Sequence, residues 1–480
     1  MEDFDPLLPP DYSLQRVIAT GEEANREERY LNARALGLDG RAFSEADKGW
    51  DQARLAWNLA ADQRPAIVAF PESAAEVVRV VNYAVENGLR IAPQATGHGA
   101  AALSTLRDVI LLKTERLNAI SIDPERGRAT VGAGVTWGPL QAAAARDGLA
   151  GLAGSSPDVG VVGYTVGGGI GWLARRYGLA CNSVLGFEVV TADGRIVHAD
   201  ADHYPDLFWA LRGGGGSFAI ITAVDFALYP VGPLYAGTLL WSQDRAAEVL
   251  GAWSSWIADV PNAVTSLGRL LNLPPIAEIP EPLRGRSFVG VEAACLTSER
   301  EGAELLGRLR ALGPEIDTFE MIPPTELSRL HMDPSHPVPA YVDGWLLSDL
   351  PSAGIHEMLT AAGPGSGSTI LSVELRHLGG ALAESSPLHG ALDTLDARFA
   401  LAAISPLPGP DAEPEIEHRA GILRSALAPW IAERNYRNFG ERARGVADFH
   451  SPETVERLRG VRRRYDPVGI VRTAHPVPTA

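Results

Sequence analysis

The sequence predicts an α+β fold built in two parts, and three observations support this prediction. A strand–helix–strand pattern occupies residues 66–92, and two hairpin patterns follow it over residues 120–132 and 187–198. The composition then changes at Tyr229-Pro230, beyond which proline-rich loops separate the expected strands and helices. Because parallel and antiparallel strands are mixed, an α+β arrangement is favoured over a doubly wound sheet.

The strand–helix–strand pattern has clear boundaries. Residues 66–70 form a short apolar run closed by Pro71, and Ser73 with Glu76 gives the capping-box spacing of a helix start. Apolar residues follow at helical spacing until Gly88, which suits a helix C-terminus. Residues 89–92 are the returning strand, so the loop after them lies at a strand end, where phosphate sites often occur.

The other strands of the first part are short apolar segments joined by turn residues. Asp193-Gly194 is a strong two-residue hairpin signal. The expected strands are residues 109–112, 120–123, 129–132, 187–191, 195–198 and 218–222. The segment before residue 60 is expected to be a helical lead-in.

The rest of the chain divides into a second domain and a tail. We expect strands over residues 288–295 and 370–375, alternating with helices over 245–258 and 300–312. In the tail, Ser451 and Pro452 open a helix that ends near Tyr465. The expected division is residues 1–231 for the first domain, 232–425 for an inserted domain, and 426–480 for a segment that completes the first.

Composition excludes several classes of partner. A chain of 480 residues is long for one core, and its net charge of −17 argues against nucleic acid or an anionic membrane as partner. Cys181 and Cys295 are too few for a disulfide framework, and no histidine or carboxylate pair has metal-ligand spacing. The start of the chain is acidic and lacks an apolar signal region, and no run reaches membrane-spanning length, so a cytoplasmic location is expected.

Two glycine-rich segments suggest a long anionic ligand held by backbone N–H groups. His98 lies between Gly97 and Gly99, and a glycine-rich run extends from Gly160 to Gly171. Taken alone, the run is as compatible with tight turns as with a cofactor, and it matches neither a Rossmann fingerprint nor a Walker loop. His98 alone is most often a loop residue without a role. Between two glycines, however, its ring nitrogen could act as a nucleophile toward an electrophilic cofactor.

Several motifs in a fixed order carry a resemblance to a known family. They are Arg64-Pro65-Ala66-Ile67-Val68, Gly97-His98, Val159-Gly160 with Gly163, Gly167 to Gly171, Tyr177-Gly178-Leu179, Asp193-Gly194, Leu207 to Gly215 and Tyr465-Asp466-Pro467. The chain resembles the vanillyl-alcohol oxidase and para-cresol methylhydroxylase superfamily of flavoproteins, in its berberine-bridge-enzyme-like branch. Within that branch it is more similar to bacterial enzymes of the 6-hydroxynicotine oxidase type than to the plant enzymes.

The resemblance implies a two-part FAD-binding domain of the para-cresol methylhydroxylase type, with an inserted α+β substrate domain. It also implies that His98 bonds the flavin at its 8α-methyl carbon. Ser156 stands where many relatives carry a second, cysteine anchor, so attachment through His98 only is expected. The residues that the resemblance assigns to the cofactor are Gln94, Ala95, Thr96, Gly97, His98, Gly99, Ser156, Pro157, Asp158, Val159, Gly160, Val162, Gly163, Gly167, Gly168, Gly169, Gly171, Trp172, Tyr177, Gly178, Ile220, Asn438 and Phe439.

The chain departs from the family pattern in two further places. The usual Arg-Ser-Gly-Gly-His becomes Gln94-Ala95-Thr96-Gly97-His98, and Tyr164 replaces a frequent histidine. These departures concern the tuning of the flavin rather than its binding.

Three residues are candidates for catalysis. Tyr436 lies in a segment similar to one that returns to the flavin in relatives, and Glu374 and Arg376 alternate along an expected strand. Tyr436 would accept a proton if a cation such as Arg376 lowered its pKa, and Glu374 is the alternative base. The competing interpretations are a core aromatic for Tyr436 and a surface pair for the other two. His331 and His336 are expected to have no special role.

The predicted function is that of an FAD-dependent oxidase. A small alcohol, sugar or amine would give a hydride from the C–H bond next to its oxygen or nitrogen to covalently bound FAD. Molecular oxygen would then take the electrons and yield hydrogen peroxide. The alternatives are a dehydrogenase with another acceptor, a reductase that uses NADPH, and a flavin-binding relative without catalytic activity.

Overall fold

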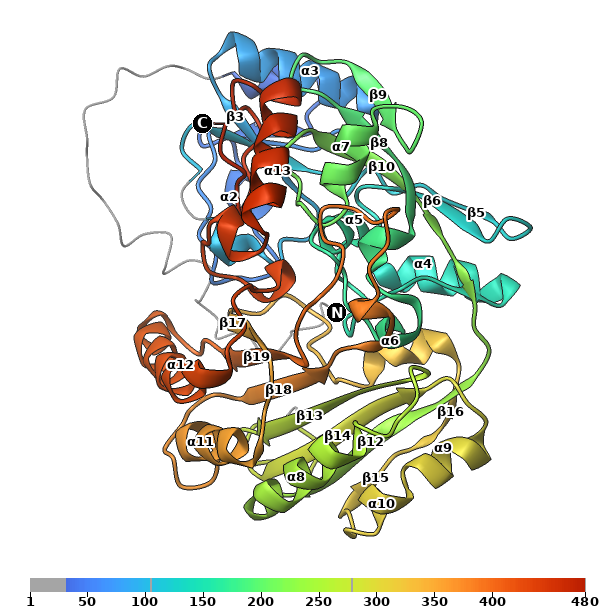
Figure 1. Cartoon of the computed structure of the whole chain (residues 1–480). Coiled ribbons are helices and arrows are strands. Elements are labelled where there is room, and N and C mark those ends of the chain that lie inside the picture. Colours follow the sequence, from blue (N-terminus) through green and yellow to red (C-terminus); the bar gives the residue numbers. More distant parts are fainter. Residues whose placement is uncertain (1–31, 104–105, 278, 480) are drawn as a thin grey trace, which may run out of the picture.

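The computed structural model describes residues 32–103, 106–277 and 279–479. Figure 1 shows two bodies of structure that meet along the middle of the molecule. One holds the smaller sheets with helices α3, α7 and α13, and the other is built on one broad sheet. The expected α+β fold with an inserted α+β domain is confirmed.

The first sheet has the strand order β1-β2-β4-β3. Its strands are β1 (Ala42–Ser44), β2 (Ile67–Ala69), β4 (Val109–Lys113) and β3 (Arg90–Gln94). β2 and β3 both run parallel to β4, because the helix α3 (Ala74–Glu86) makes the crossover between them. Ser73 caps this helix by accepting a hydrogen bond from the Glu76 backbone N–H, as the sequence predicts.

The segment before residue 60 differs from the expected helical lead-in. Its described part contains β1, which pairs with β2, and only the short helices η1 (Ala33–Leu36) and α2 (Trp50–Ala53). The expectation is wrong there because strand pairing with β2 decides the conformation. Residues 1–31, including the acidic start, lie outside the described residues.

The second sheet is antiparallel, with the order β5-β6-β10-β8-β9. Both predicted hairpins are present, β5 with β6 and β8 with β9. The bounds are β5 (Ile120–Asp123), β6 (Arg128–Gly132), β8 (Val184–Val190), β9 (Ile196–Ala199) and β10 (Ile220–Ala227), with the small pair β7 (Leu149–Ala150) and β11 (Tyr229–Pro230) beside them. The helices of this part are α4 (Trp137–Ala144), α5 (Val161–Val166), α6 (Ala174–Tyr177) and α7 (Pro205–Leu211).

The inserted part is organised around one antiparallel sheet with the order β15-β12-β14-β13-β18-β19-β17, and β16 also pairs with β12. The strands are β12 (Leu234–Ser242), β13 (Val264–Asn272), β14 (Ser287–Cys295), β15 (Ile316–Asp317), β16 (Glu320–Ile322), β17 (Ala340–Leu347), β18 (Ser372–His377) and β19 (Phe399–Pro406). The predicted strands at residues 288–295 and 370–375 correspond to β14 and β18, and β18 lies inside the sheet.

Helices cover one face of the broad sheet. They are α8 (Ala246–Trp256), α9 (Glu299–Leu305), α10 (Gly307–Arg310), α11 (Ser352–Ala362) and α12 (Glu413–Leu427). Val373 and Leu375 of β18 join the hydrophobic core beneath these helices, together with Trp241, Trp253 and Trp345. Glu374 and Arg376 therefore point to the other face, because side chains alternate along a strand.

The tail returns to the first part of the chain. Helix α13 (Pro452–Tyr465) starts at the Ser451 cap, as predicted, and packs on α7. After α13, the tail forms two backbone hydrogen bonds with Ile91 of β3. The Ile91 N–H donates to Ile470 O, and Ile91 O accepts from the Arg472 N–H, each at 2.7 Å. The tail thus shares a core with the first part.

None of the helices in the described part of the chain combines the length and apolar character needed to cross a membrane.

Candidate functional site

The histidine loop, residues 94–99, starts at the end of β3. Its backbone is fixed by the segment before β2, where the Trp57 N–H donates to Thr96 O and the Asn58 N–H donates to Gly97 O. Gly97 has a φ of +88°, and a Cβ there would lie 2.7 Å from Gln94 Nε2. Only glycine suits this position, so the local sequence determines how the next residue is presented.

His98 is held between an aromatic ring and a carboxylate. Its ring stacks on Trp57 with 3.9 Å between centroids, and its Nε2 lies 3.4 Å from Asp158 Oδ1. That distance suits an ion pair, but the angle does not make a hydrogen bond, and Nε2 is buried without a hydrogen-bond partner. The Nε2 atom of His98 is thus sheltered from water and faces the Asp158 carboxylate.

Asp158 belongs to the serine loop, residues 154–159. It accepts hydrogen bonds from Ser156 Oγ at 3.0 Å and from Trp57 Nε1. Burial raises the pKa of Asp158, but His98, Ser156 and Trp57 together outweigh burial and lower it. Asp158 is therefore an anion that faces His98.

The serine loop leads into the glycine run, residues 160–171. Trp137 and Gly138, at the start of α4, donate backbone N–H groups to Val159 O and Pro157 O. A Cβ on Gly160 would lie 2.9 Å from the Ala95 Cβ, so this glycine lets the run approach the histidine loop. Helix α5 begins directly after Gly160.

The middle of the glycine run packs against the tail. A Cβ on Gly167 would lie 1.7 Å from Asn438 Oδ1, and a Cβ on Gly168 would lie 2.9 Å from Tyr436 Cε2. The Tyr436 hydroxyl accepts hydrogen bonds from the N–H groups of Gly169 and Ile170, both at 2.9 Å. Glycine is needed here because the tail comes so close.

Tyr436 is buried, and its pKa differs from the expectation. Burial raises the pKa well above the ordinary value, while the two backbone N–H donors and then Arg376 lower it by less. The expectation that Arg376 lowers the pKa of Tyr436 below its ordinary value is therefore wrong. The effect of Arg376 is smaller than those of burial and of the two backbone N–H groups. The Tyr436 oxygen also accepts a hydrogen bond from Asn438 Nδ2 at 3.1 Å, so it fastens the glycine run to the tail.

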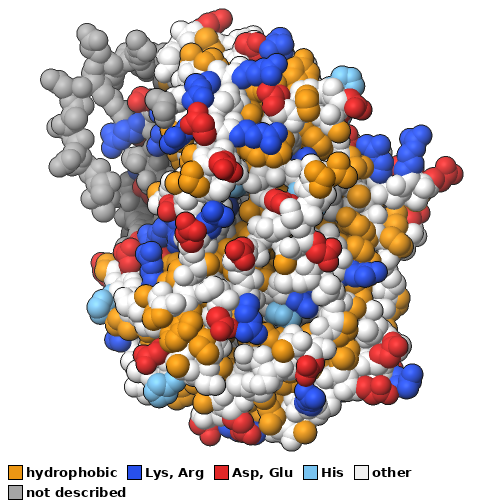
Figure 2. Space-filling view, in the orientation of Figure 1, with side chains coloured by type: hydrophobic (Ala, Val, Ile, Leu, Met, Phe, Trp, Pro, Cys, Tyr) orange, Lys and Arg blue, Asp and Glu red, His pale blue; other side chains and the backbone are white. Residues whose placement is uncertain are grey.

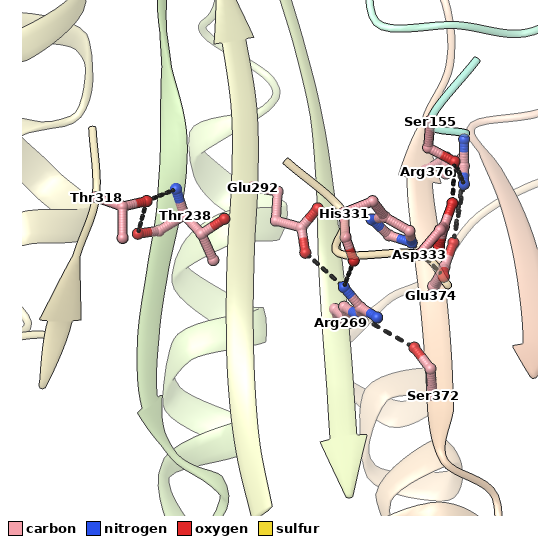
Figure 3. A network of polar contacts seen from close by, with 10 residues as sticks. All are labelled: Ser155, Thr238, Arg269, Glu292, Thr318, His331, Asp333, Ser372, Glu374 and Arg376. Carbon is pink, nitrogen blue, oxygen red and sulfur yellow. Dashed lines mark hydrogen bonds and ion pairs between the residues drawn. The ribbon is translucent and has the colours of Figure 1, made fainter. Parts of the chain in front are cut away.

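Glu374 and Arg376 of the insert lie beside Ser155 of the serine loop (Figure 3), and Arg376 also reaches the tail. We call the region where the loops, the tail and the insert meet the junction. Glu374 is fully buried, and its Oε2 accepts from Arg376 Nε at 3.3 Å and from Nη2 at 3.2 Å. Arg376 lies over the Phe439 ring at 5.2 Å and donates to Ser155 Oγ at 3.4 Å. The pair is thus not on an exposed sheet surface, because Arg376 contacts both the tail and the serine loop.

The remaining candidate residues lie around the junction in different settings. The Trp172 ring contacts His331 with 6.4 Å between centroids, and the Tyr177 ring lies against Tyr229. Gly178 has a φ of +83° and approaches Ala381. By contrast, Ile220 lies within the core of β10 with 1% of its surface exposed, so its side chain serves packing.

Two ionisable residues at the junction were not found from the sequence. His331 bridges Glu292 and Glu374, although it was expected to have no role. Glu441 accepts a hydrogen bond from Asn58 Nδ2 at 3.1 Å, and burial raises its pKa to about 8. No local signal identifies His331, since both carboxylates lie about forty residues away or more. Glu441 could have been found, because it follows Phe439 by two residues.

Figure 2 shows how charged side chains are distributed on one face of the molecule. Acidic and basic side chains are interspersed there without a broad basic patch (Figure 2). Within the described ranges, no group of three or more His, Cys, Asp or Glu side chains could hold a metal ion.

Comparison with known proteins identifies the fold and the kind of cofactor. Residues 65–200 match a family described as an FAD binding domain. The (R)-6-hydroxynicotine oxidase of Paenarthrobacter nicotinovorans is 30% identical over 467 residues, which cover 91% of this chain and 96% of that protein. The crystal structure of 6-hydroxy-D-nicotine oxidase from Arthrobacter nicotinovorans superposes with a TM-score of 0.82, covering 94% of this chain and 100% of that one at 26% identity.

A plant protein shares the same fold. The berberine-bridge-enzyme-like protein 1 of Physcomitrella patens, in its D396N variant, superposes with a TM-score of 0.82 at 21% identity, covering 93% of this chain and 99% of that one.

Proposed function

Because the chain belongs to the FAD-linked oxidoreductases of the berberine-bridge-enzyme-like branch, we propose that it is an oxidase that holds FAD covalently through His98. The observation that carries this proposal is the buried Nε2 of His98 beside the anionic Asp158, because a carboxylate there favours a proton on Nε2 and leaves the other ring nitrogen as the nucleophile. When bound, FAD supplies the hydride acceptor and returns the electrons to oxygen.

The histidine loop, the serine loop and the glycine run would hold the cofactor. The backbone of the first two loops is fixed by Trp57, Asn58 and α4, so their N–H groups are presented in a defined arrangement. The cofactor-binding residues named from the sequence are proposed in this role, except that Ile220 acts through the core. We propose that three glycines of the run contact the cofactor through their backbone atoms: Gly167, Gly168 and Gly169. The side on which each would carry a Cβ is already occupied by neighbouring protein atoms, among them those of the tail and of Tyr164.

His98 is the only anchor that we propose. The Asp158 carboxylate can hold the imidazole so that one nitrogen is a nucleophile, as an adjacent acid does in other activated histidines. Ser156 donates its hydroxyl to Asp158, which makes it part of this support rather than a second attachment point. A serine hydroxyl cannot form the thioether that a cysteine would.

The wall formed by β18 and the tail would receive the substrate, for which we propose a small alcohol, sugar or amine. Arg376 and Phe439 present a guanidinium and an aromatic ring to the junction, so Arg376 would orient the substrate. Glu374 would act mainly through Arg376, because both of its oxygens have partners. Tyr436 would hold the glycine run in place and remain protonated near neutral pH.

Three alternatives to the oxidase remain. A dehydrogenase would use the same site but pass the electrons to another acceptor, a reductase would take its hydride from NADPH, and a non-catalytic relative would bind flavin only. The cytoplasmic location also remains a prediction.

A screen of alcohols, sugars and amines tests the oxidase assignment. The purified protein is incubated in air with each compound, and peroxide is measured beside the reduction of an artificial dye. We expect peroxide with at least one compound and no need for the dye. Turnover with dye but not with oxygen would identify a dehydrogenase, and flavin that no compound reduces would contradict an enzymatic role.

Tyr436→Phe tests the role of the tyrosine. The variant removes the acceptor of three donors, namely the backbone N–H groups of Gly169 and Ile170 and the side-chain amide of Asn438, so we expect a loss of about 1–3 kcal/mol in unfolding free energy. With a substrate from the screen, anaerobic flavin reduction should slow by the same factor at every pH, because no proton leaves the phenol. A slowing that appears only at high pH would restore Tyr436 as the base. Tyr229→Phe, which removes a partly buried hydroxyl bonded to Ser183, is the control.

A further inference from the structure

A cluster of buried and partly buried charges connects the insert to the serine loop (Figure 3). Its cations and anions come from three neighbouring strands and from the connection between β16 and β17. We call it the charge cluster, and its members are Arg269 of β13, Glu292 of β14, Glu374 and Arg376 of β18, and His331 and Asp333 of the connection.

His331 lies at the centre of the charge cluster. Its Nδ1 is 2.7 Å from Glu292 Oε2 and its Nε2 is 2.5 Å from Glu374 Oε1, while 1% of its side chain is exposed. A carboxylate only accepts hydrogen bonds, so both ring nitrogens must carry protons to satisfy both partners. The geometry therefore describes an imidazolium.

The charges balance when His331 is protonated. Arg269, His331 and Arg376 are then the three cations, and Glu292, Glu374 and Asp333 are the three anions. Arg269 Nη1 lies 2.8 Å from Glu292 Oε1, which completes the set of close pairs around the two buried glutamates. Without the proton on His331, the cluster would carry one uncompensated negative charge away from water, which is strongly unfavourable.

The charge cluster reaches His98 through the serine loop. Ser155 Oγ donates to Asp333 Oδ2 at 2.9 Å and accepts from Arg376 Nη2 at 3.4 Å, so it lies between an anion and a cation of the cluster. The next residue, Ser156, contacts Asp158, the partner of His98. His331 also lies against Trp172, directly after the glycine run.

We infer that His331 is a positioning residue: its positive charge keeps Glu374 ionised, and Glu374 in turn holds Arg376 against Ser155 and Phe439. The charge cluster thereby fixes the serine loop beside His98 relative to the substrate-facing sheet. This inference rests on the proposed function, because it places the bound flavin next to that loop.

The pH dependence follows from the groups that face His331, which are Glu292, Glu374, Arg269 and Asp333. Burial lowers the pKa of His331, but the attraction of Glu374 and Glu292 raises it to about 9 despite Arg269. A raised histidine pKa adds stability that is fully present below about 6.5 and is lost as the pH rises through about 9. Burial raises the pKa of Glu374, but His331 and Arg376 together lower it by more than burial raises it. The stability that ionised Glu374 contributes is therefore lost only in acid.

The first experiment measures unfolding against pH for the wild type, His331→Gln and His331→Gln/Glu292→Gln. The single variant lacks one positive charge, so a carboxyl of the charge cluster should take up about one proton, and stability should fall from about pH 4.5 upward. Glu441 contributes equally to all three proteins, so the stability of each variant is compared with that of the wild type at the same pH. The double variant restores the balance of charges, so this difference should be constant from about pH 5 to 6.5 and should then change in favour of the variant up to about pH 9, where the wild type loses the proton of His331. This experiment needs neither flavin nor substrate.

The second experiment follows the visible circular dichroism of the bound flavin in the same proteins. The wild type and the double variant should keep one spectrum between about pH 5 and 6.5. His331→Gln should change its spectrum with pH in that window, because Arg376 loses its ionised partner. Ser155→Ala, which removes the contact without changing a charge, should shift the spectrum equally at every pH.

The outcomes separate the inference from the function on which it rests. If the single variant fails to fold while the double variant folds, charge balance is supported. If both variants lose the same stability at every pH, or if neither folds, the inference is overturned and His331 only fills space. A chain that binds no flavin would contradict the proposed function, while the unfolding experiment would still test the charge balance.

Discussion

The loops around His98 and the sheet of the insert meet at one junction but use opposite kinds of contact. The loops are held by backbone hydrogen bonds and by glycines that permit close approach, as at Gly97 and Gly167. The wall of the insert is held by buried charged side chains, with Glu374 and His331 almost wholly enclosed. Backbone contacts suit a cofactor that is the same in all relatives. Side-chain contacts can be altered by substitution, so they suit a wall that differs between relatives with different substrates.

This difference predicts separable effects of mutation. A change in the loops should affect flavin content, whereas a change in the charge cluster should leave flavin attached while it affects stability and turnover.

Glu374→Gln should have the largest effect on stability. It leaves His331 and Arg376 without their shared anion, and breaking a buried pair in this way costs about 3–5 kcal/mol. Unfolding by denaturant measures the loss, and the absorption of the protein after acid precipitation measures the flavin that stays attached. Glu304→Gln is the control, since its pair with Arg300 is exposed and should contribute less than about 1 kcal/mol. Loss of flavin from folded Glu374→Gln would contradict the claim that the loops alone determine flavin content.

Gly167→Ala should destabilise the protein by about 3 kcal/mol and also lower its flavin content. The added Cβ would lie 1.7 Å from Asn438 Oδ1, so the tail must move away from the glycine run. Gly251→Ala in α8 is the matched control, because a Cβ there meets nothing within 4 Å and should be neutral or slightly stabilising. Equal flavin content in both variants would mean that the tail does not support the cofactor.

Glu441→Gln tests a buried charge outside the charge cluster, in the tail. No cation among the described residues lies close enough to the Glu441 carboxyl to offset the effect of burial on its pKa. Burial raises its pKa to about 8, so the folded protein binds the proton more tightly, and stability falls as the pH rises from about 4.5 through 8. The variant should remove this fall and gain on the order of 2 kcal/mol at pH 9, with Asn58 still bonded. Unfolding at pH 5 and pH 9 tests it, and an unchanged difference between the two would contradict the assignment.

The sequence predicted the elements whose signals are local. The Ser73 cap, the Asp193-Gly194 hairpin and the Ser451 start of α13 each depend on a few adjacent residues, and all three are present. The alternation along β18 also correctly placed Glu374 and Arg376 on one face. The resemblance identified the cofactor and the family before any contact was known.

Features that depend on distant partners were not predictable. β1 forms because it pairs with β2, and the helix expected over residues 300–312 divides at Leu306 into α9 and α10. The role of His331 arises only when β14 and β18 bring Glu292 and Glu374 to its two nitrogens. The high pKa of Tyr436 likewise follows from burial, which no motif describes.

Covalent attachment of FAD through His98 is the central claim, and acid precipitation of the purified protein tests it most directly. The wild-type pellet should be yellow, whereas His98→Ala should leave its flavin in the supernatant. Asp158→Asn should give a partly yellow pellet, because His98 keeps its place on Trp57 but loses its anionic partner. A colourless wild-type pellet with all of the FAD in the supernatant would contradict the account.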